Sequence, residues 1–433
     1  MVAELLILGA IILIGVVGNF ISARTHIPES LFLIATGLVI GPVLHLVPSA
    51  FFNENLGLFV SFALVIVLIN SGMNLDMRHA LRTMRGALLF VSLVFVCTVA
   101  VVTAVLHGLF DWPILHGLFL GIIVSGTTTV TVTHLVEHLD PHHKLLRRET
   151  KDLLVLESVL NDVSVIAGAS VLVAIIAPGV VNAQGVLTTL FNEFLVSILV
   201  GAGMGVCWLF LYAYRLHANK LSYIFTVGVA LTIYAIAEFL NLNGAIAVIL
   251  FAITVGNYKM ILKFLHAHTH LENLRKAVDA MRQTDVEFTF LIRTFFFVVL
   301  GLIFDPTILS MRGLLLIAGA ILVCKFVARY VASRLLAVMS RKYAGDHFVR
   351  TTVVANGFTS TLAAFVGVQA GIAIPYLAEI VLLLVISTTI TAILSTATHH
   401  QLVKRSIARK EIIHRRAVDG ARPARGLVRR VRR

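Results

Sequence analysis

Four polar side chains lie close together within an otherwise apolar segment of the sequence. Residues 153–170 read LLVLESVLNDVSVIAGAS and contain Glu157, Ser158, Asn161 and Asp162. The segment is long enough to form most of a transmembrane helix. A carboxylate at membrane depth is costly, so it normally faces a polar cavity and marks a pathway for ions or protons. The segment therefore predicts an ion-handling site with Asp162 as its carrier.

The helical period separates the two acids of this segment. At 3.6 residues per turn, Glu157 and Asp162 point roughly 140° apart around the helix axis. One acid is expected to face the ion cavity, and the other is expected to contact a neighbouring helix. Glu157 is assigned to the neighbouring helix as a structural ion pair, with direct ligation of the ion as the alternative.

Three basic residues in later apolar segments are candidate partners for Glu157. Each of them needs a partner, because an unpaired cation at that depth is very unfavourable. Arg329 is the preferred partner and Arg293 is the next. The candidates are Arg293, Lys325 and Arg329.

Residues with oxygen-bearing side chains lie near Asp162 in the sequence and in the preceding apolar segment. Ser158 and Asn161 adjoin it on the same predicted helix, and the preceding apolar segment supplies Thr127 and Thr128. Such hard oxygen ligands suit a small alkali cation such as Na⁺ rather than a transition metal. A cation and a proton would compete for the same carboxylate oxygens of Asp162, and that competition is itself a mechanism of exchange.

The composition places these segments in a membrane. The 433 residues are 58% hydrophobic and only 13% charged, and the mean hydropathy of +0.95 lies far above that of soluble domains. Apolar runs of about 20 residues predict helices, because a bilayer satisfies no backbone polar groups. We expect an all-α polytopic membrane protein whose membrane domain spans residues 1–400.

About 13 apolar segments can be marked along the chain, and basic residues fall in alternate linkers between them. The positive-inside rule then places the C-terminus in the cytoplasm and the N-terminus outside, in a cell (inner) membrane. Residues 401–433 contain 12 Lys and Arg against 2 acids, so most of the net charge of +13 lies in this tail. A basic tail beside a membrane indicates contact with anionic lipid rather than with nucleic acid.

Two apolar segments are interrupted by glycine and hydroxyl residues. The fifth contains Gly126 within the run 125–129, SGTTT, and the twelfth contains Asn356 and Gly357 within the run 356–361, NGFTST. They lie about seven segments apart, as expected for two inverted six-helix repeats joined by one helix. Such paired interruptions point to the binding site of a transporter. The alternative is that the small residues only let helices pack closely.

These motifs together resemble the NhaP and sodium/proton exchanger branch of the monovalent cation/proton antiporters. The resemblance rests on the E-S-x-x-N-D run of residues 157–162, the GLVIGP run of 37–42, the residues FFF and LG at 295–297 and 300–301, and Arg329. It implies an NhaA-like antiporter fold with crossed, broken fifth and twelfth helices, a mobile core and a homodimer. It also implies that Asp162 binds the ion, Asn161 orients the site, Ser158 and Thr127 contribute oxygens, and Glu157 pairs with Arg329.

The resemblance implies electroneutral one-for-one exchange of Na⁺ or Li⁺ for H⁺, without a cofactor. The chain departs from the family where it has Thr127-Thr128-Thr129, because relatives usually have Thr-Asp-Pro there. The departure leaves exchange of K⁺ for H⁺, and a cation channel or transport-inactive sensor, as alternatives. An intramembrane aspartyl protease would need two facing aspartates, and Asp162 is the one deep aspartate that the sequence makes evident, so we expect no enzyme.

Overall fold

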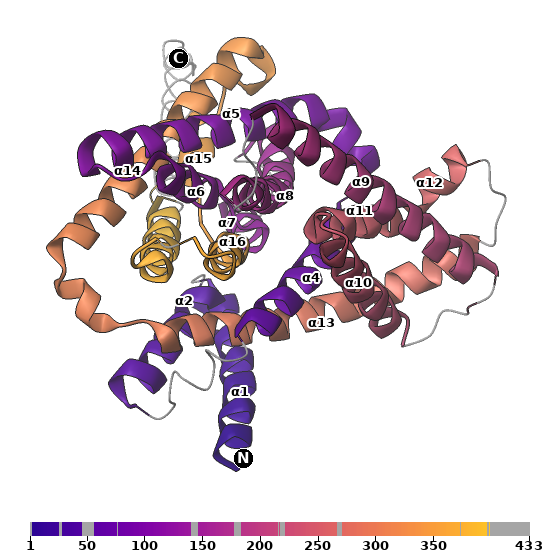
Figure 1. Cartoon of the computed structure of the whole chain (residues 1–433), viewed down its shortest axis with the longest axis horizontal. Coiled ribbons are helices and arrows are strands. Elements are labelled where there is room, and N and C mark those ends of the chain that lie inside the picture. Colours follow the sequence, from indigo (N-terminus) through magenta and orange to yellow (C-terminus); the bar gives the residue numbers. More distant parts are fainter. Residues whose placement is uncertain are drawn as a thin grey trace, which may run out of the picture.

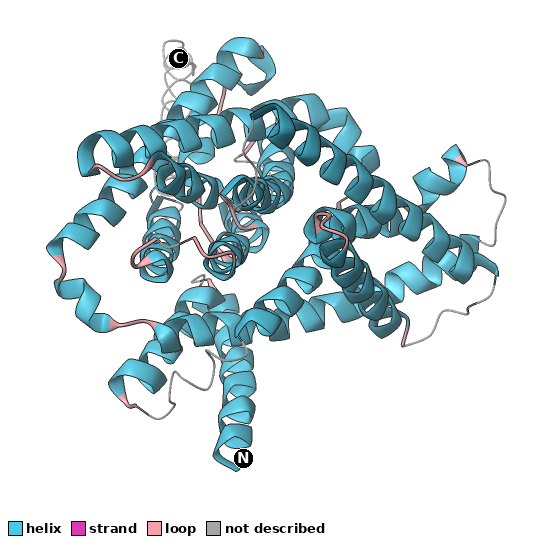
Figure 2. Ribbon diagram, viewed as in Figure 1, coloured by secondary structure: helices cyan, strands magenta, loops and turns pink. Residues whose placement is uncertain are grey.

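The computed structural model describes residues 2–25, 28–45, 56–75, 77–139, 146–176, 183–214, 216, 221–265, 271–372, 374–395 and 398. Within these ranges every regular element is a helix, as Figure 2 shows. The predicted basic tail of residues 401–433 lies outside the described residues.

The helices follow one another in the order that the apolar segments predict. The first half comprises α1 (Val2–Thr25), α2 (Glu29–Leu38) with a π-helical turn (Val39–Val43), α4 (Leu56–Asn74), α5 (Met77–Phe110), α6 (Ile114–Ser125), α7 (Thr129–Leu139), α8 (Arg148–Ile176) and α9 (Ala183–Tyr214). The second half comprises α10 (Ser222–Phe239), α11 (Gly244–Gly256), α12 (Tyr258–Phe264), α13 (Leu271–Ile303), α14 (Arg312–Met339), α15 (His347–Thr352), α16 (Phe358–Gln369) and a last helix (Leu377–Ser395), with short 3₁₀ turns at Pro306–Ser310 and Arg341–Tyr343.

Eight helices of the described ranges are long and apolar enough to cross a membrane, or nine if α11 and α12, which meet at 84°, form one span. Shorter apolar helices lie at Gly9–Ser22, Glu29–Val43, Ile114–Ser125 and Phe358–Val368. The chain is thus a multi-pass, all-helical membrane protein. A break divides each of the two interrupted segments, so neither of the half-helices Ile114–Ser125 and Phe358–Val368 is long enough by itself to cross a membrane. The arrangement as about 13 spans in two inverted repeats stays a prediction.

The helices gather into two groups, visible in Figure 1. One group, the core group, contains α5, α6, α7, α8, α14, α15 and α16, with the last helix beside them. The other, the scaffold group, contains α1, α2, α4 and α9 to α13. The two groups meet where α16 packs against α4 and α13 and where α8 packs against α4, α9 and α11.

Close backbone contacts and aromatic rings hold α13 in this arrangement. A Cβ atom on Gly37 of α2 would lie 2.2 Å from the Val298 carbonyl oxygen, and one on Gly301 would lie 2.3 Å from the Ile34 carbonyl oxygen. Only glycines permit α2 and α13 to approach this closely. On its other side, α13 places the Phe296 ring 4.6 Å from the Phe358 ring of α16. Both groups are therefore anchored on α13, next to the break in the twelfth segment.

Candidate ion-binding site

The breaks in the fifth and twelfth segments lie against each other. Residues 126–128 separate α6 from α7, and residues 353–357 separate α15 from α16. The Thr128 backbone N–H donates to the Ala355 carbonyl oxygen at 2.9 Å. A Cβ atom on Gly126 would lie 2.2 Å from Ser360 Oγ, and one on Gly357 would lie 2.5 Å from Thr128 Cβ. The two glycines are thus required by the close approach of the two unwound segments.

Asp162 of α8 lies beside these breaks and is 5% exposed. The Thr129 hydroxyl, at the start of α7, donates to Asp162 Oδ2 at 3.2 Å. The Thr359 side chain, at the start of α16, also interacts with this carboxylate. Among the described residues no donor reaches the buried Asp162 Oδ1. A buried acceptor without a donor is costly, so Oδ1 is free to take a cation or a proton.

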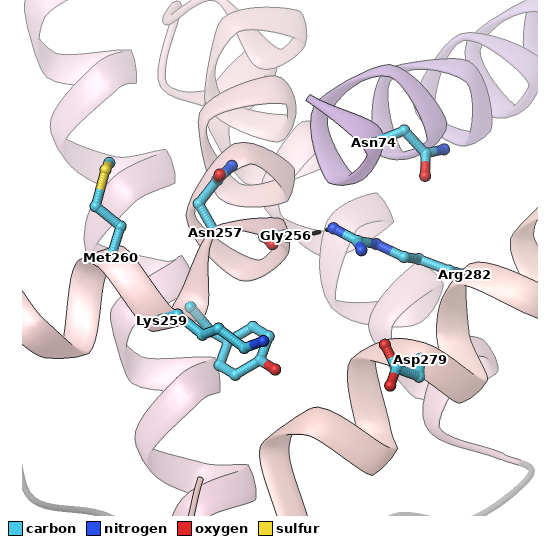
Figure 3. A pocket seen from close by; sticks show the side chains of 8 residues that line it. Asn74, Gly256, Asn257, Lys259, Met260, Asp279 and Arg282 are labelled. Atoms are coloured by element: carbon cyan, nitrogen blue, oxygen red, sulfur yellow. Dashed lines mark hydrogen bonds between the residues drawn. The ribbon is translucent and has the colours of Figure 1, made fainter. Parts of the chain in front are cut away.

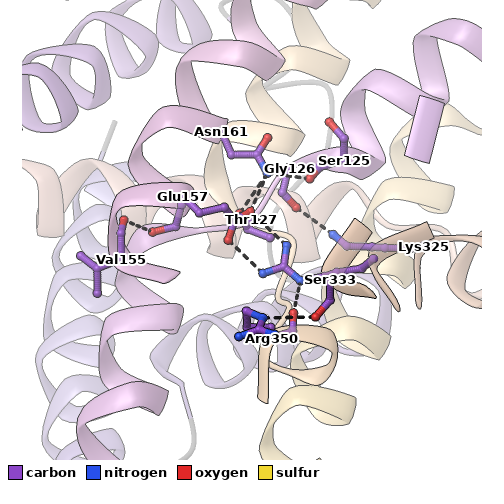
Figure 4. A network of polar contacts seen from close by, with 11 residues as sticks. Ser125, Gly126, Thr127, Val155, Glu157, Asn161, Lys325, Ser333 and Arg350 are labelled. Carbon is purple, nitrogen blue, oxygen red and sulfur yellow. Dashed lines mark hydrogen bonds and ion pairs between the residues drawn. The ribbon is translucent and has the colours of Figure 1, made fainter. Parts of the chain in front are cut away.

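The Asn161 side chain is held in one orientation by three acceptors. Its Nδ2 atom donates to the Ser125 carbonyl oxygen at 2.9 Å, to Thr127 Oγ1 at 3.1 Å and to Glu157 Oε1 at 3.2 Å. The amide oxygen Oδ1 therefore points away from them, and within the described ranges no donor reaches it. Figure 4 shows this amide above Glu157 and Thr127. Asn161 thus offers a second buried oxygen next to Asp162 in the chain.

Glu157 is fully occupied by other side chains. Arg329 Nη1 donates to Glu157 Oε1 at 3.0 Å, and Nη2 donates to Oε2 at 2.9 Å. The Thr127 hydroxyl donates to Oε1 at 3.1 Å. Both charged side chains are at most 1% exposed. The geometry is that of a bidentate ion pair, which is the strong form of this interaction.

The far side of Arg329 is also held. Its Nε donates to the Arg350 carbonyl oxygen at 2.7 Å, and its guanidinium lies 5.3 Å from the Phe90 ring centre. Arg350 in turn donates to Ser333 and to the Tyr343 carbonyl oxygen. A hydrogen-bonded path therefore runs from α15 through Arg329 and Glu157 to Asn161.

Lys325 of α14 contacts both breaks. Its ammonium donates to the Gly126 carbonyl oxygen at 2.7 Å and to Asn356 Oδ1. The side chain is buried, and Figure 4 shows it reaching Gly126 from the side opposite Glu157. The C-terminal carbonyls of α6 carry partial negative charge, so the ammonium stabilises the interruption electrostatically.

The structure places the predicted site residues at several different positions. Asn161 adjoins Asp162, whereas Thr127 faces Glu157, and the Ser158 hydroxyl donates to the Val155 carbonyl oxygen of its own helix at 2.8 Å. Thr128 packs against Gly357. Arg293, the second candidate partner of Glu157, instead forms an ion pair with Glu29.

Sequence reasoning missed the hydroxyls of Thr129 and Thr359 as contacts of Asp162. Both belong to the hydroxyl runs that mark the breaks, so composition contains the signal. Each stands at the first residue of the second half-helix or directly after it. Which hydroxyl of such a run faces Asp162 depends on the path of the unwound backbone.

A cavity of about 280 Å³ lies away from Asp162 and its contacts, at the ends of α4 and α11 (Figure 3). Arg282 of α13 reaches into it, and its Nη2 donates to the carbonyl oxygens of Met73 and Gly256. These are carbonyls of helix C-termini, which need such partners. Arg282 therefore has a structural role there.

Comparisons with known proteins agree on one family. The family model described as sodium/hydrogen exchanger, transmembrane, matches residues 9–402. The chain is 26% identical over 335 residues to a protein of Alkalimonas amylolytica named K(+)/H(+) antiporter NhaP. That match covers 76% of this chain and 54% of the relative, so the chain spans about half the length of that curated relative.

The fold is similar to that of a solved antiporter. The structure of the sodium proton antiporter MjNhaP1 from Methanocaldococcus jannaschii at pH 8 matches with a TM-score of 0.72 and 18% identity, covering 93% of this chain and 97% of the other. An electron microscopy structure of the same antiporter matches with a TM-score of 0.65 and 19% identity, covering 93% and 96%.

Proposed function

Because the chain belongs to the sodium/hydrogen exchanger family, a family of transporters rather than enzymes, we propose that it is a secondary antiporter exchanging Na⁺ or Li⁺ for H⁺. Asp162 is the residue that carries the cation and the proton in turn. The observation that carries the proposal is the pair of buried oxygens without donors, Asp162 Oδ1 and Asn161 Oδ1. A cation bound there, or a proton on the carboxylate, would remove the cost of leaving these oxygens unpaired.

The geometry supports one charge per cycle. Glu157 is neutralised by Arg329 and has two further donors, so its charge stays fixed. Asp162 is then the group of the site that changes its occupant. One carboxylate that alternately binds one monovalent cation and one proton gives one-for-one, electroneutral exchange.

Several oxygens are available to a cation at Asp162. Asn161, the residue before Asp162, has a buried Oδ1 without a donor, and the hydroxyls of Thr129 and Thr359 already contact the carboxylate. Thr127 and Thr128 stay proposed ligands that would require a shift of the unwound segments. Ser158 stays a proposed ligand that would require its hydroxyl to turn away from the Val155 carbonyl oxygen. Carboxylate, amide and hydroxyl oxygens are the ligands that hard cations prefer.

Transport requires that Asp162 reach both sides of the membrane in turn. We propose that the core group moves relative to the scaffold group in an elevator-like motion, with the chain as a homodimer. The site residues 126–129, 157–162 and 356–360 all lie in the core group, so the site would move as one body. Rigid-body movement of one bundle of helices against the other is the common pattern among transporters with inverted repeats.

Exchange of K⁺ for H⁺ is the second candidate. Thr128 supplies a hydroxyl where the family resemblance predicts an acid, so the site offers less negative charge to a small, strongly hydrated cation. The A. amylolytica relative is named as a K(+)/H(+) antiporter. A channel or a transport-inactive sensor stays the further alternative for the same reason.

The test is a dequenching assay in everted vesicles without other antiporters, with Na⁺, Li⁺ and K⁺ added in turn. The wild-type protein is expected to release the proton gradient on addition of its cation, and Asp162→Asn is expected to abolish this response. Asp285→Asn is the matched control, because Asp285 is equally buried but lies in the scaffold group between Asn70 and Tyr223. Full activity of Asp162→Asn would refute the proposal. Single-channel currents without proton coupling would favour a channel.

A further inference from the structure

A second cavity lies between the scaffold group and the breaks of the core group. Its volume is about 150 Å³. From the scaffold group it is lined by residues of α1, α2 and α13, and from the core group by Thr128, Thr131 and Gly357. Thr128 directly precedes Thr129, the donor to Asp162. The cavity therefore borders the ion site at the crossing of the two broken segments.

An ion pair lines this cavity. Arg293 of α13 contacts Glu29 Oε1 at the start of α2. The close contact of Gly37 with Gly301 fixes the register of these helices, and Glu29 and Arg293 each stand eight residues before those glycines. The charged pair is thus held against the cavity wall by the same helix packing that positions α13.

This ion pair differs from the pair formed by Glu157 and Arg329. The latter is at most 1% exposed and bidentate, whereas the side chains of Arg293 and Glu29 are 14% and 12% exposed. Within the described part of the chain, Arg293 Nε has no hydrogen-bond acceptor. The pair is therefore incompletely satisfied and open to the cavity, as expected of charges that exchange partners.

The carboxylate of Glu29 supplies a negative charge near the position at which this chain lacks the acid of the family pattern. Thr128 stands where the family resemblance predicts an acid, and Glu29 places a carboxylate in the same cavity as Thr128. The hydroxyls of Ser22, Ser30 and Thr131 line the same space. These are oxygen ligands of the kind that an alkali cation accepts.

We propose that this cavity is a vestibule on the cation's route to Asp162 and that Glu29, released from Arg293, is a transient cation-binding site in it. The inference rests on the proposed antiport and names a second carboxylate for the same transport. Arg24 lies in the last turn of α1, and Glu29 begins α2 shortly after it. By the positive-inside rule, the predicted topology then places the vestibule on the cytoplasmic side.

The pair would work as an electrostatic exchange. Arg293 neutralises Glu29 while the vestibule is empty, which limits the cost of a charge at this depth. An entering cation replaces the guanidinium at the carboxylate and then moves to Asp162. A carboxylate in a low-dielectric cleft raises the local concentration of cations.

Neutralising either member of the pair gives opposite effects on the apparent KM for the cation, measured in everted vesicles where the cytoplasmic face is outward. Glu29→Gln is expected to raise KM by about tenfold with little change in maximal rate, because the vestibule loses its attraction. Arg293→Gln is expected to lower KM by about threefold, because the carboxylate no longer has a competitor. The double variant should have a KM above that of the wild type but below that of Glu29→Gln, in which the unpaired guanidinium of Arg293 also repels the cation. Glu272→Gln is the control, because Glu272 is an exposed acid at the start of α13, the helix of Arg293. The KM of this variant should equal that of the wild type.

A purely structural pair predicts a different pattern. Both single variants would then lose maximal rate and protein yield together, the double variant would recover them, and KM would not move in opposite directions. That pattern would overturn the proposal.

A binding measurement separates this inference from the proposed antiport. Excess ²³Na⁺ relaxation is recorded with purified Asp162→Asn, at constant ionic strength maintained with choline chloride. The proposal predicts that residual Na⁺ binding is reduced by adding Glu29→Gln and is unchanged by adding Glu272→Gln. Equal relaxation in all three proteins would refute the vestibule site, even if wild-type transport is normal. Inactive wild-type vesicles with Glu29-dependent Na⁺ binding would instead refute the antiport alone.

Discussion

Removal of Arg329 provides a quantitative test of the buried ion pair. In Arg329→Met, Glu157 Oε1 keeps its bonds from Thr127 and Asn161, whereas Oε2 loses its donor from Arg329. Two charge-assisted hydrogen bonds are lost, and each contributes about 1.5–3 kcal/mol. Breaking a buried ion pair by removing one partner costs about 3–5 kcal/mol. We therefore expect the free energy of unfolding to fall by about 3–5 kcal/mol.

The double variant Glu157→Gln/Arg329→Met isolates the interaction. It leaves no buried charge at this position, so it should recover most of the loss, with a coupling energy of about 3 kcal/mol. The assay is reversible unfolding in mixed detergent and SDS micelles, with the four proteins of the cycle compared at one pH. A loss below about 1 kcal/mol in Arg329→Met, or a double variant as unstable as the sum of the single ones, would refute the structural role of the pair.

Two further predictions concern Thr129 and His347. Thr129→Val removes the donor to Asp162 Oδ2, so the apparent affinity for the cation should fall by about tenfold, or about 1.4 kcal/mol. Thr129→Ser keeps the hydroxyl and should keep the affinity. Equal KM values for both variants would contradict the contact. His347 precedes the twelfth apolar segment, and its Nδ1 lies 3.1 Å from Arg350 Nη2. Burial, together with the charges of Arg350 and Arg334, lowers the pKa of His347. Because the folded state then binds protons less readily than the unfolded state, its stability should fall as the pH drops below about 6.5. Thermal unfolding at several pH values should show a weaker acid-side loss in His347→Gln, and an unchanged pH dependence would exclude this role.

Helical periodicity and charge balance were sufficient for part of the site. The period separates Glu157 from Asp162, and a buried acid and a buried base must meet. The structure has Arg329 donating to both oxygens of Glu157. The interruptions at Gly126 and Gly357 could also be located, because glycine and hydroxyl residues in an apolar segment are visible in composition.

The contacts around the interruptions could not be predicted in the same way. In an unwound segment the helical period no longer applies, so the sequence could not indicate that Thr129, rather than Thr127, contacts Asp162. The pair of Glu29 and Arg293 joins α2 to α13, and its register depends on the glycine contact between these helices. Glu29 follows Pro28 at the start of an apolar segment, where a charged residue usually indicates only a helix end.

The central claim is that one carboxylate, Asp162, binds the cation and the proton in competition. The most direct measurement is the apparent KM and the maximal rate of exchange as a function of pH on the side of cation entry. Competition at Asp162 predicts that, on the acid side, KM rises about tenfold for each unit by which the pH falls. The maximal rate at saturating cation is predicted to stay unchanged. A KM that is independent of pH, with a maximal rate that falls as protons are added, would contradict a shared site.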